Sequence, residues 1–465
     1  MSSSSRDLVV LGAGPAGLAA AWRAAERGNS VTVIERADRV GGMAASFEVA
    51  GVRVDHGSHR LHPATPPHLL EALRRLLGDD LQTRPRNGRL RLYDQWIGFP
   101  LKAAELARAV PLPVAARIAR DAVVQPFRRR GTESYADVLR SSLGPEMYDA
   151  MYAPYAEKLW GLPGAEIDAE QARVRVTADT PIKVAARIVR RQPGGQGRMF
   201  YYPRRGFGQI GEALADAAAG AGADIQVGAE ATEVYAGPGS VRVETLSGRD
   251  VEARRMFSTL PLPVLARLTR PAPPPAALED ASALRFRAMV LVYLVHDGGR
   301  WSPFDAHYLP GRETAVTRIS EPANYRVSPD DPTDRTVICA EIPCALGDDV
   351  WSADDDALAS LVHSGLAATG LPPVHGRDVV VRRLPHVYPI YVRGYADHLA
   401  GLERWASTLP NVTTFGRLGL FAHDNTHHAM VMAYDAVGAL GAGGRWDDAS
   451  WSEARDRFRQ HVVED

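Results

Sequence analysis

A glycine-rich segment at residues 12–17 constrains this chain more than any other feature. It reads GAGPAG, follows a predicted strand at residues 6–11, and precedes a predicted helix of small residues. Gly12 permits a tight turn from strand to helix, Gly14 lets a pyrophosphate approach the backbone, and Gly17 lets helix and strand pack closely. The spacing predicts a turn that cradles a pyrophosphate, with four cofactor contacts, namely Gly12, Gly14, Ala16 and Gly17.

An acidic residue completes this pattern. A second predicted strand, residues 30–34, ends at Glu35, which lies 18 residues after Gly17. At that distance an acidic side chain can accept both hydroxyls of a ribose, and it disfavours a 2′-phosphate. The N-terminus of the intervening helix offers unpaired amides and a positive dipole end to the phosphates. Together these features predict a bound dinucleotide rather than a structural glycine turn.

A second glycine turn indicates which dinucleotide is bound. Residues 39–42 read RVGG, and residues 51–59 read GVRVDHGSH. A nicotinamide dehydrogenase has no need of this second turn, so the backbone is expected to pass close to another part of an extended cofactor. At this point the chain resembles the FAD-binding superfamily of flavin amine oxidases, protoporphyrinogen oxidases, phytoene desaturases and UDP-galactopyranose mutases. The resemblance implies FAD as the cofactor, with further contacts from Arg36, Arg39, Gly41, Gly42, Gly57, Ser58 and His59.

Composition narrows the class of protein. With 54 basic and 55 acidic side chains the formal charge is −1, which gives no indication of nucleic-acid binding. Cys339 and Cys344 lack zinc-type partners and are expected to be free thiols of a reducing cytosol. No run reaches the ~18 apolar residues of a transmembrane span, and no signal-peptide core is visible. We therefore expect a cytoplasmic protein, with a peripheral membrane contact left open.

The length of 465 residues favours two domains that share the cofactor. We predict an α/β fold in which a Rossmann-type FAD-binding domain is joined to a discontinuous α+β substrate domain. The FAD-binding domain is assigned residues 1–95, 201–265 and 405–465. The substrate domain is assigned 96–200, rich in helix formers, and 266–404, which opens with a proline-rich linker and continues with strands.

The C-terminal segment resembles the last cofactor motif of the superfamily. Gly416, Arg417 and Asp424 precede a predicted helix at residues 428–440, and the resemblance implies contacts with the flavin end of FAD. His423, His427 and His428 could suggest a metal site, since imidazoles at i and i+4 share a helix face. We expect no metal, because the segment already matches the flavin motif and no carboxylate or cysteine ligand accompanies the histidines.

Other motifs concern the reaction side. The loop with His59 resembles the Gly-x-His loops that lie beside the isoalloxazine, where a histidine can tune the ring. Residues 155–161 (YAEKLWG), 317–321 (TRISE) and 388–391 (YPIY) resemble elements of the mutase branch. Arginines from both insertions facing one pocket would clamp a diphosphate or carboxylate. The resemblance implies this role for Arg318, with Arg173 or Arg175, and implies substrate contacts at Tyr388 and Tyr391.

The resulting hypothesis is an FAD-dependent oxidoreductase that oxidises a small molecule, anionic if the clamp exists, by hydride transfer to flavin N5. His59 and Arg318 are the residues predicted to shape the reaction side. The runner-up is a redox-neutral sugar-nucleotide mutase in which reduced flavin is the nucleophile. A departure weakens it, because residues 421–425 read FAHDN where mutases show Tyr-x-Tyr-x-Asp. A third alternative is a non-catalytic flavoprotein.

Overall fold

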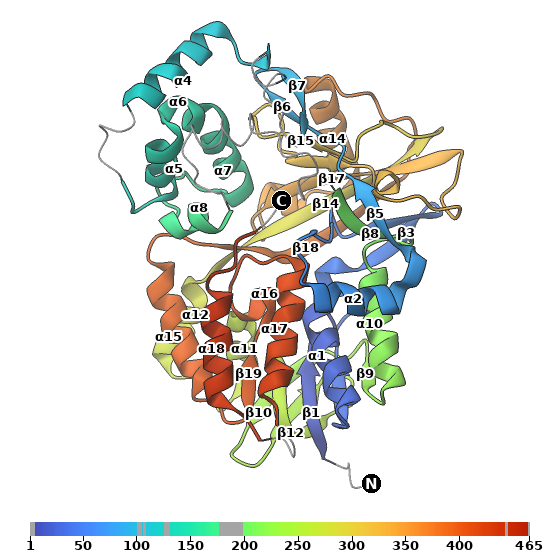
Figure 1. Cartoon of the computed structure of the whole chain (residues 1–465), viewed down its shortest axis with the longest axis vertical. Helices are drawn as coiled ribbons and strands as arrows, with labels where there is room; N and C mark the ends of the chain where they lie inside the picture. The colour runs from blue at the N-terminus through green and yellow to red at the C-terminus, as the bar shows by residue number, and fades with distance from the viewer. Residues whose placement is uncertain are drawn as a thin grey trace.

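The computed structural model describes residues 5–99, 105, 108–124, 131–175, 199–441 and 445–463. Two large sheets organise it. The first sheet and its helices fill the lower half of Figure 1, and the second sheet and a separate group of helices fill the upper half.

The first sheet has a parallel centre and an antiparallel edge. Its strand order is β13-β10-β11-β12-β1-β2-β9, and β19 pairs with β12. Strands β9, β2, β1, β12 and β19 run parallel, whereas β10, β11 and β12 form an antiparallel meander. The bounds are β1 Arg6–Leu11, β2 Val31–Ile34, β9 Asp224–Gln226, β10 Ala231–Ala236, β11 Val241–Thr245, β12 Val251–Ser258, β13 Thr269–Arg270 and β19 Val412–Thr414. The predicted α/β fold is thereby confirmed.

Small side chains allow the helices to pack closely on this sheet. Helix α1 (Pro15–Glu26) is rich in alanine, and its buried alanines place it between α10 (Gln209–Gly220) and α17 (Thr426–Ala439). Helix α18 (Asp448–Phe458) packs against α17 in turn. This layer covers one face of the sheet and joins segments from both ends of the chain.

The opposite face carries helices from another part of the sequence. They are α11 Leu262–Leu268, α12 Pro275–Ala283 and α15 Tyr395–Ser407. Ala277 of α12 and Leu402 of α15 are buried in one cluster with Val9 of β1. The proline run at 271–275, expected to be a linker, thus leads directly into a helix of the first sheet's layer, although residues 266–404 were assigned to the other domain.

The second sheet is mostly antiparallel, with the order β18-β14-β17-β16-β15-β6-β7. Its bounds are β6 Gly88–Leu92, β7 Gln95–Phe99, β14 Arg285–Asp297, β15 Ala306–Tyr308, β16 Arg318–Ser320, β17 Arg335–Cys344 and β18 Val379–Ile390. Strand β6 belongs to this sheet through parallel pairing with β15, although residues up to 95 were assigned to the cofactor domain. A hairpin of β3 (Ser46–Val49) and β4 (Val52–Asp55) packs on its face and links the two halves.

A group of helices lies beside the second sheet, at the upper left of Figure 1. They are α4 Leu112–Val124, α5 Tyr135–Leu143, α6 Pro145–Met147, α7 Ala153–Trp160 and α8 Ala169–Arg175. Part of the helical insertion predicted over 96–200, residues 176–198, lies outside the described residues. Among the residues that the structure describes, no helix is long and apolar enough to cross a membrane.

Candidate active site

Three separate segments meet at the ends of neighbouring parallel strands. Strands β1, β12 and β19 are adjacent, so the residues that follow them gather at one edge of the sheet. Gly12 has a φ of 100°, and a Cβ there would lie 2.4 Å from Oγ1 of Thr259. Gly416 has a φ of 80°, and its Cβ would lie 3.2 Å from Cβ of Ala16. The first and last glycine motifs of the sequence are therefore in contact.

The space beside Gly14 is open. A Cβ at Gly14 would meet nothing within 4 Å, whereas one at Gly17 would lie 1.9 Å from the carbonyl oxygen of Gly12. Helix α1 begins directly after Gly14, and no side chain caps its N-terminus. A phosphate can therefore approach the helix amides at Gly14, while Gly17 serves close packing.

Glu35 lies next to this turn at the end of β2. Its Oε2 accepts a hydrogen bond of 2.8 Å from the amide of Ala13, and its Oε1 accepts one of 2.9 Å from the amide of Ala37. These bonds hold the carboxylate at the edge of the glycine turn, where the sequence places a ribose.

The second glycine turn lies against the first. The amide of Gly41 donates to the carbonyl of Ala13 at 2.7 Å, and a Cβ at Gly42 would lie 3.2 Å from Cα of Gly14. The two arginines predicted to hold the cofactor are less engaged. Arg39 pairs with its exposed neighbour Asp38, and Arg36 is exposed.

A buried ion pair holds the loop of Gly57, Ser58 and His59. Arg318 donates two hydrogen bonds to Glu341, and Oε1 of Glu341 also accepts the amide of Ser58 at 2.8 Å. Gly57 has a φ of 87°, which the turn requires. His59 stacks on Phe207 with ring centroids 5.2 Å apart, and burial lowers the pKa of its imidazole. Arg318 thus contacts the loop of Gly57, Ser58 and His59, as its bond to the carbonyl of Ser58 shows. Its positive charge is already neutralised by Glu341.

Two other arginines flank Tyr388 without such a match. The guanidinium carbons of Arg175 and Arg417 each lie 5.0 Å from the centroid of the Tyr388 ring. Within the described part of the chain, Nε and Nη2 of Arg417 are buried and have no hydrogen-bond partner. Arg175 also lies over Trp160, at 5.3 Å, and no carboxylate of the described residues forms an ion pair with it. The two guanidinium groups and the rings of Trp160 and Tyr388 thus form a cationic cluster.

His423 is buried beside these arginines. Its ring centroid lies 5.4 Å from that of Trp160, and the side-chain amide nitrogen of Gln171 lies 3.0 Å from its Nε2. Burial, followed by the charges of Arg175 and Arg417, lowers its pKa well below the usual histidine range. The imidazole is therefore neutral at pH 7, which limits the local positive charge.

Two other residues predicted to bind the substrate, Arg173 and Tyr391, interact with other parts of the protein. Arg173 is exposed and pairs with Glu170 at 3.0 Å. Tyr391 is buried, stacks on Tyr395, and donates its hydroxyl to the carbonyl of Phe421. Of the two arginines proposed from the first insertion, Arg175 is thus the one that reaches Tyr388.

Asp424 faces histidines. Its Oδ1 lies 3.3 Å from Nδ1 of His428 and 2.8 Å from Nδ1 of His461. Burial opposes ionisation of Asp424, but hydrogen bonds from both histidines outweigh it and lower the pKa of the carboxyl. The reason given for expecting no metal, the lack of a carboxylate beside the histidines, is therefore wrong.

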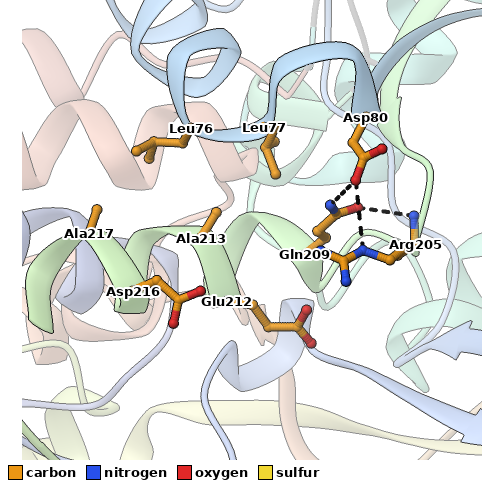
Figure 2. A pocket seen from close by; sticks show the side chains of 9 residues that line it. All are labelled: Leu76, Leu77, Asp80, Arg205, Gln209, Glu212, Ala213, Asp216 and Ala217. Atoms are coloured by element: carbon orange, nitrogen blue, oxygen red, sulfur yellow. Dashed lines mark hydrogen bonds and ion pairs between the residues drawn. The ribbon is translucent and has the colours of Figure 1, made fainter. Parts of the chain in front are cut away.

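A cleft elsewhere on the molecule is separate from this site. It lies between α2 (Pro67–Leu77) and α10 and has a volume of about 410 Å³. Figure 2 shows Leu76 and Leu77 facing Ala213 and Ala217, with Asp80 bonded to Gln209. None of the predicted site residues lines it.

The geometry around the glycine turns fits an extended dinucleotide such as FAD. The open space at Gly14 suits a pyrophosphate, and Glu35 is held beside the same turn at the end of β2, where it could accept ribose hydroxyls. Sequence reasoning missed Thr259, Glu341 and the role of His423. A signal for Glu341 was present, because it is the single charged residue between Val337 and Ile342 in an apolar strand.

A family model described as "Flavin containing amine oxidoreductase" matches residues 15–391. The chain is 42% identical over 92 residues to a protein of Mycobacterium tuberculosis named as a putative flavin-containing monoamine oxidase, AofH. That match covers 20% of this chain and only 19% of the relative. The predictions of an enzyme of this superfamily and of FAD as its cofactor are confirmed by the family match.

Solved structures share the fold. A reduced UDP-galactopyranose mutase has a TM-score of 0.81 at 19% identity, covering 99% of this chain and 100% of that one. A wild-type putrescine oxidase bound to putrescine has a TM-score of 0.62 at 19% identity, covering 94% of this chain and 99% of that one. At these identities the likeness establishes the arrangement of the chain and leaves the reaction to the site itself.

Proposed function

Because the chain belongs to the family of flavin-containing amine oxidoreductases, we propose that it oxidises a small anionic molecule by hydride transfer to N5 of FAD. The observation that carries the proposal is the placement of Arg175 and Arg417 on Tyr388, where neither forms a direct ion pair with a carboxylate of the described residues. When bound, the flavin supplies the redox chemistry. The residues of the chain supply binding, orientation and charge.

The cofactor would be held by backbone and carboxylate groups. Gly14 leaves room for the pyrophosphate at the N-terminus of α1, and Glu35 would accept the ribose hydroxyls. Gly41 and Gly42 keep the second turn close to the first. His59, held by its stacking on Phe207, would present a neutral imidazole to the isoalloxazine ring of FAD.

The substrate would be recognised by charge and by aromatic contact. A guanidinium whose donors are buried and unpaired loses hydration, and an anionic partner restores those hydrogen bonds. A protonated amine in the same place would meet two positive charges at short range. The cationic cluster of Arg175 and Arg417 therefore favours a carboxylate or phosphate over a cationic amine.

Arg318 has a different role in this proposal. Its guanidinium is bound to Glu341, which also accepts the amide of Ser58. We assign Arg318 to positioning of the loop that carries His59, and not to the anion itself.

A second candidate, the redox-neutral mutase, is favoured by one observation. Arg175 lies over the rings of Trp160 and Tyr388, which belong to the two segments that resemble mutase elements, residues 155–161 and 388–391. Against it stands His423 in the segment where mutases carry a tyrosine.

An anaerobic screen distinguishes the two candidates. The purified protein is mixed with carboxylates, amines, polyenes, porphyrinogens and nucleotide sugars, and the oxidised-flavin absorbance is followed. Stoichiometric bleaching by an anionic compound supports the oxidoreductase. Isomerisation of a nucleotide sugar, only after prior reduction of the flavin, supports the mutase and refutes net oxidation.

We propose a cytoplasmic setting for the protein. Cys339 and Cys344 are both free and buried, as expected for a reducing cytosol. Helix α4 exposes Leu112 and Val123 at 85% and 72%, which leaves a peripheral membrane contact as a second setting. Sedimentation with anionic vesicles separates the two.

A further inference from the structure

Three side chains from two distant segments converge on one point beside α17. Asp424 and His428 lie one turn apart at the start of this helix, and His461 approaches from the chain after α18. Their potential ligand atoms all lie within 4.8 Å of one another. We propose that Asp424, His428 and His461 bind a divalent cation of the zinc type, independently of the flavin chemistry.

The spacing of the ligand atoms suits a small tetrahedral ion. Bonds of about 2.0–2.1 Å around zinc place neighbouring ligand atoms roughly 3.3 Å apart. The distances from Oδ1 of Asp424 are 3.3 Å to His428 and 2.8 Å to His461. Small rotations of the side chains would therefore be enough to admit the ion.

The cap of α17 fixes the position of one of the two imidazoles. The amide of Asn425 donates to Nδ1 of His428 at 3.3 Å, as part of the capping of α17. This bond holds the imidazole of His428 with its Nδ1 3.3 Å from Oδ1 of Asp424, where a cation could bind both atoms.

The burial of Asp424 also supports a bound cation. The side chain of Asp424 is 1% exposed, and its second oxygen, Oδ2, has no hydrogen-bond partner in the described part of the chain. Burying a carboxylate is costly unless its charge is matched. The two imidazoles stack 4.2 Å apart at an angle of 16°, so both rings are already ordered beside it. Two histidines and one carboxylate are common zinc ligands, and water would fill the fourth position.

The expected consequence is structural. A bound ion would fasten the chain after α18 to the start of α17, next to the segment that holds Arg417. Metal binding to a folded site stabilises the fold by mass action, so the melting temperature should rise with zinc.

The test measures zinc on tag-free holoenzyme. The protein is stripped with EDTA, incubated with Zn²⁺, passed through a desalting column and analysed by mass spectrometry for metal. We expect about one zinc per chain, a higher melting temperature with Zn²⁺, and reversal by EDTA. The His461→Ala variant should lose the zinc or bind it at least about tenfold more weakly. His363→Ala, at an exposed position on α14 (Asp355–Ala368), should retain it.

Other outcomes overturn the proposal. Wild-type protein that retains no zinc, or shows no thermal shift with Zn²⁺, excludes the site without recourse to a variant. Equal zinc retention by His461→Ala, with FAD content intact to show that it is folded, places the metal elsewhere.

Discussion

Arg318 and Glu341 face each other across paired strands β16 and β17 and are joined by hydrogen bonds of 2.9 and 2.7 Å. The two bonds run from Nε to Oε1 and from Nη2 to Oε2. Because Oε1 also accepts the amide of Ser58, this buried pair fixes the loop that leads to His59.

We expect Glu341→Gln to lower the free energy of unfolding by about 1–3 kcal/mol, because it leaves the partly buried Arg318 cation without its partner. Urea denaturation measures the change. The double variant Glu341→Gln/Arg318→Met should recover part of the loss. A single variant as stable as the wild type would show that the pair does not hold the loop.

A methyl group at Gly14 should block the cofactor while sparing the fold. Both Gly14 and Gly220 have free space where a Cβ would lie, and neither has a positive φ. Gly14→Ala should weaken FAD binding at least about tenfold, since the methyl occupies the space of the pyrophosphate. Gly220→Ala should leave FAD content unchanged. Equal FAD content in the two variants would contradict the assignment of the turn.

The two neighbouring arginines Arg173 and Arg175 give a matched pair for substrate recognition. Arg175→Met should raise the KM for an anionic substrate at least about tenfold, because it removes a guanidinium from the pocket. Arg173→Met should have little effect, since Arg173 is exposed and pairs with Glu170. Steady-state kinetics with both variants, at equal FAD content, measures the difference. Equal KM values would exclude Arg175 from the site.

His307 should make stability fall in acid. It is buried among Trp96, Trp301 and Phe304, and burial, with a smaller effect of Arg89, lowers its pKa to about 3. The unfolded chain takes up a proton below its ordinary pKa of about 6.5, while the folded protein resists until about 3. The contribution of neutral His307 to the free energy of unfolding is complete above about pH 6.5. It is lost progressively as the pH falls from about 6.5 to about 3.

The loss from His307 should approach about 1.4 kcal/mol per pH unit within the window. Urea unfolding between pH 7 and pH 4, compared for wild type, His307→Phe and the exposed-site control His363→Phe, measures it. Only His307→Phe should flatten the pH dependence. Parallel curves for all three proteins would show that His307 does not resist protonation.

Much of the cofactor half could be predicted from the sequence because its information is local. The strand, turn and helix around Gly12, Gly14 and Gly17 are specified by adjacent residues, and so is the acid that ends β2. The contact between Gly416 and Ala16 could not be predicted from adjacent residues, since it depends on strands far apart in the chain being neighbours.

The substrate side was harder to predict because it depends on partners. Arg318 and Arg175 look alike in sequence, and only the register of β16 with β17 shows that Glu341 neutralises the first. The resemblance predicts Asp424 as a cofactor contact, and nothing in the sequence indicates that His461 also lies beside it. The roles of Arg318, Arg175 and Asp424 therefore depend on whether the fold brings a charged partner from a distant segment beside each of them.

The most direct test of the account is an anaerobic titration of the holoenzyme with two compounds of opposite charge state, an anion and its neutral derivative. One is the carboxylate or phosphate substrate identified by the screen, and the other is its neutral ester. The account predicts stoichiometric bleaching of the flavin by the anion, and binding by the ester at least about tenfold weaker, because Arg175 and Arg417 lose their counter-charge. Equal bleaching by both compounds, or bleaching only by cationic amines, would contradict it.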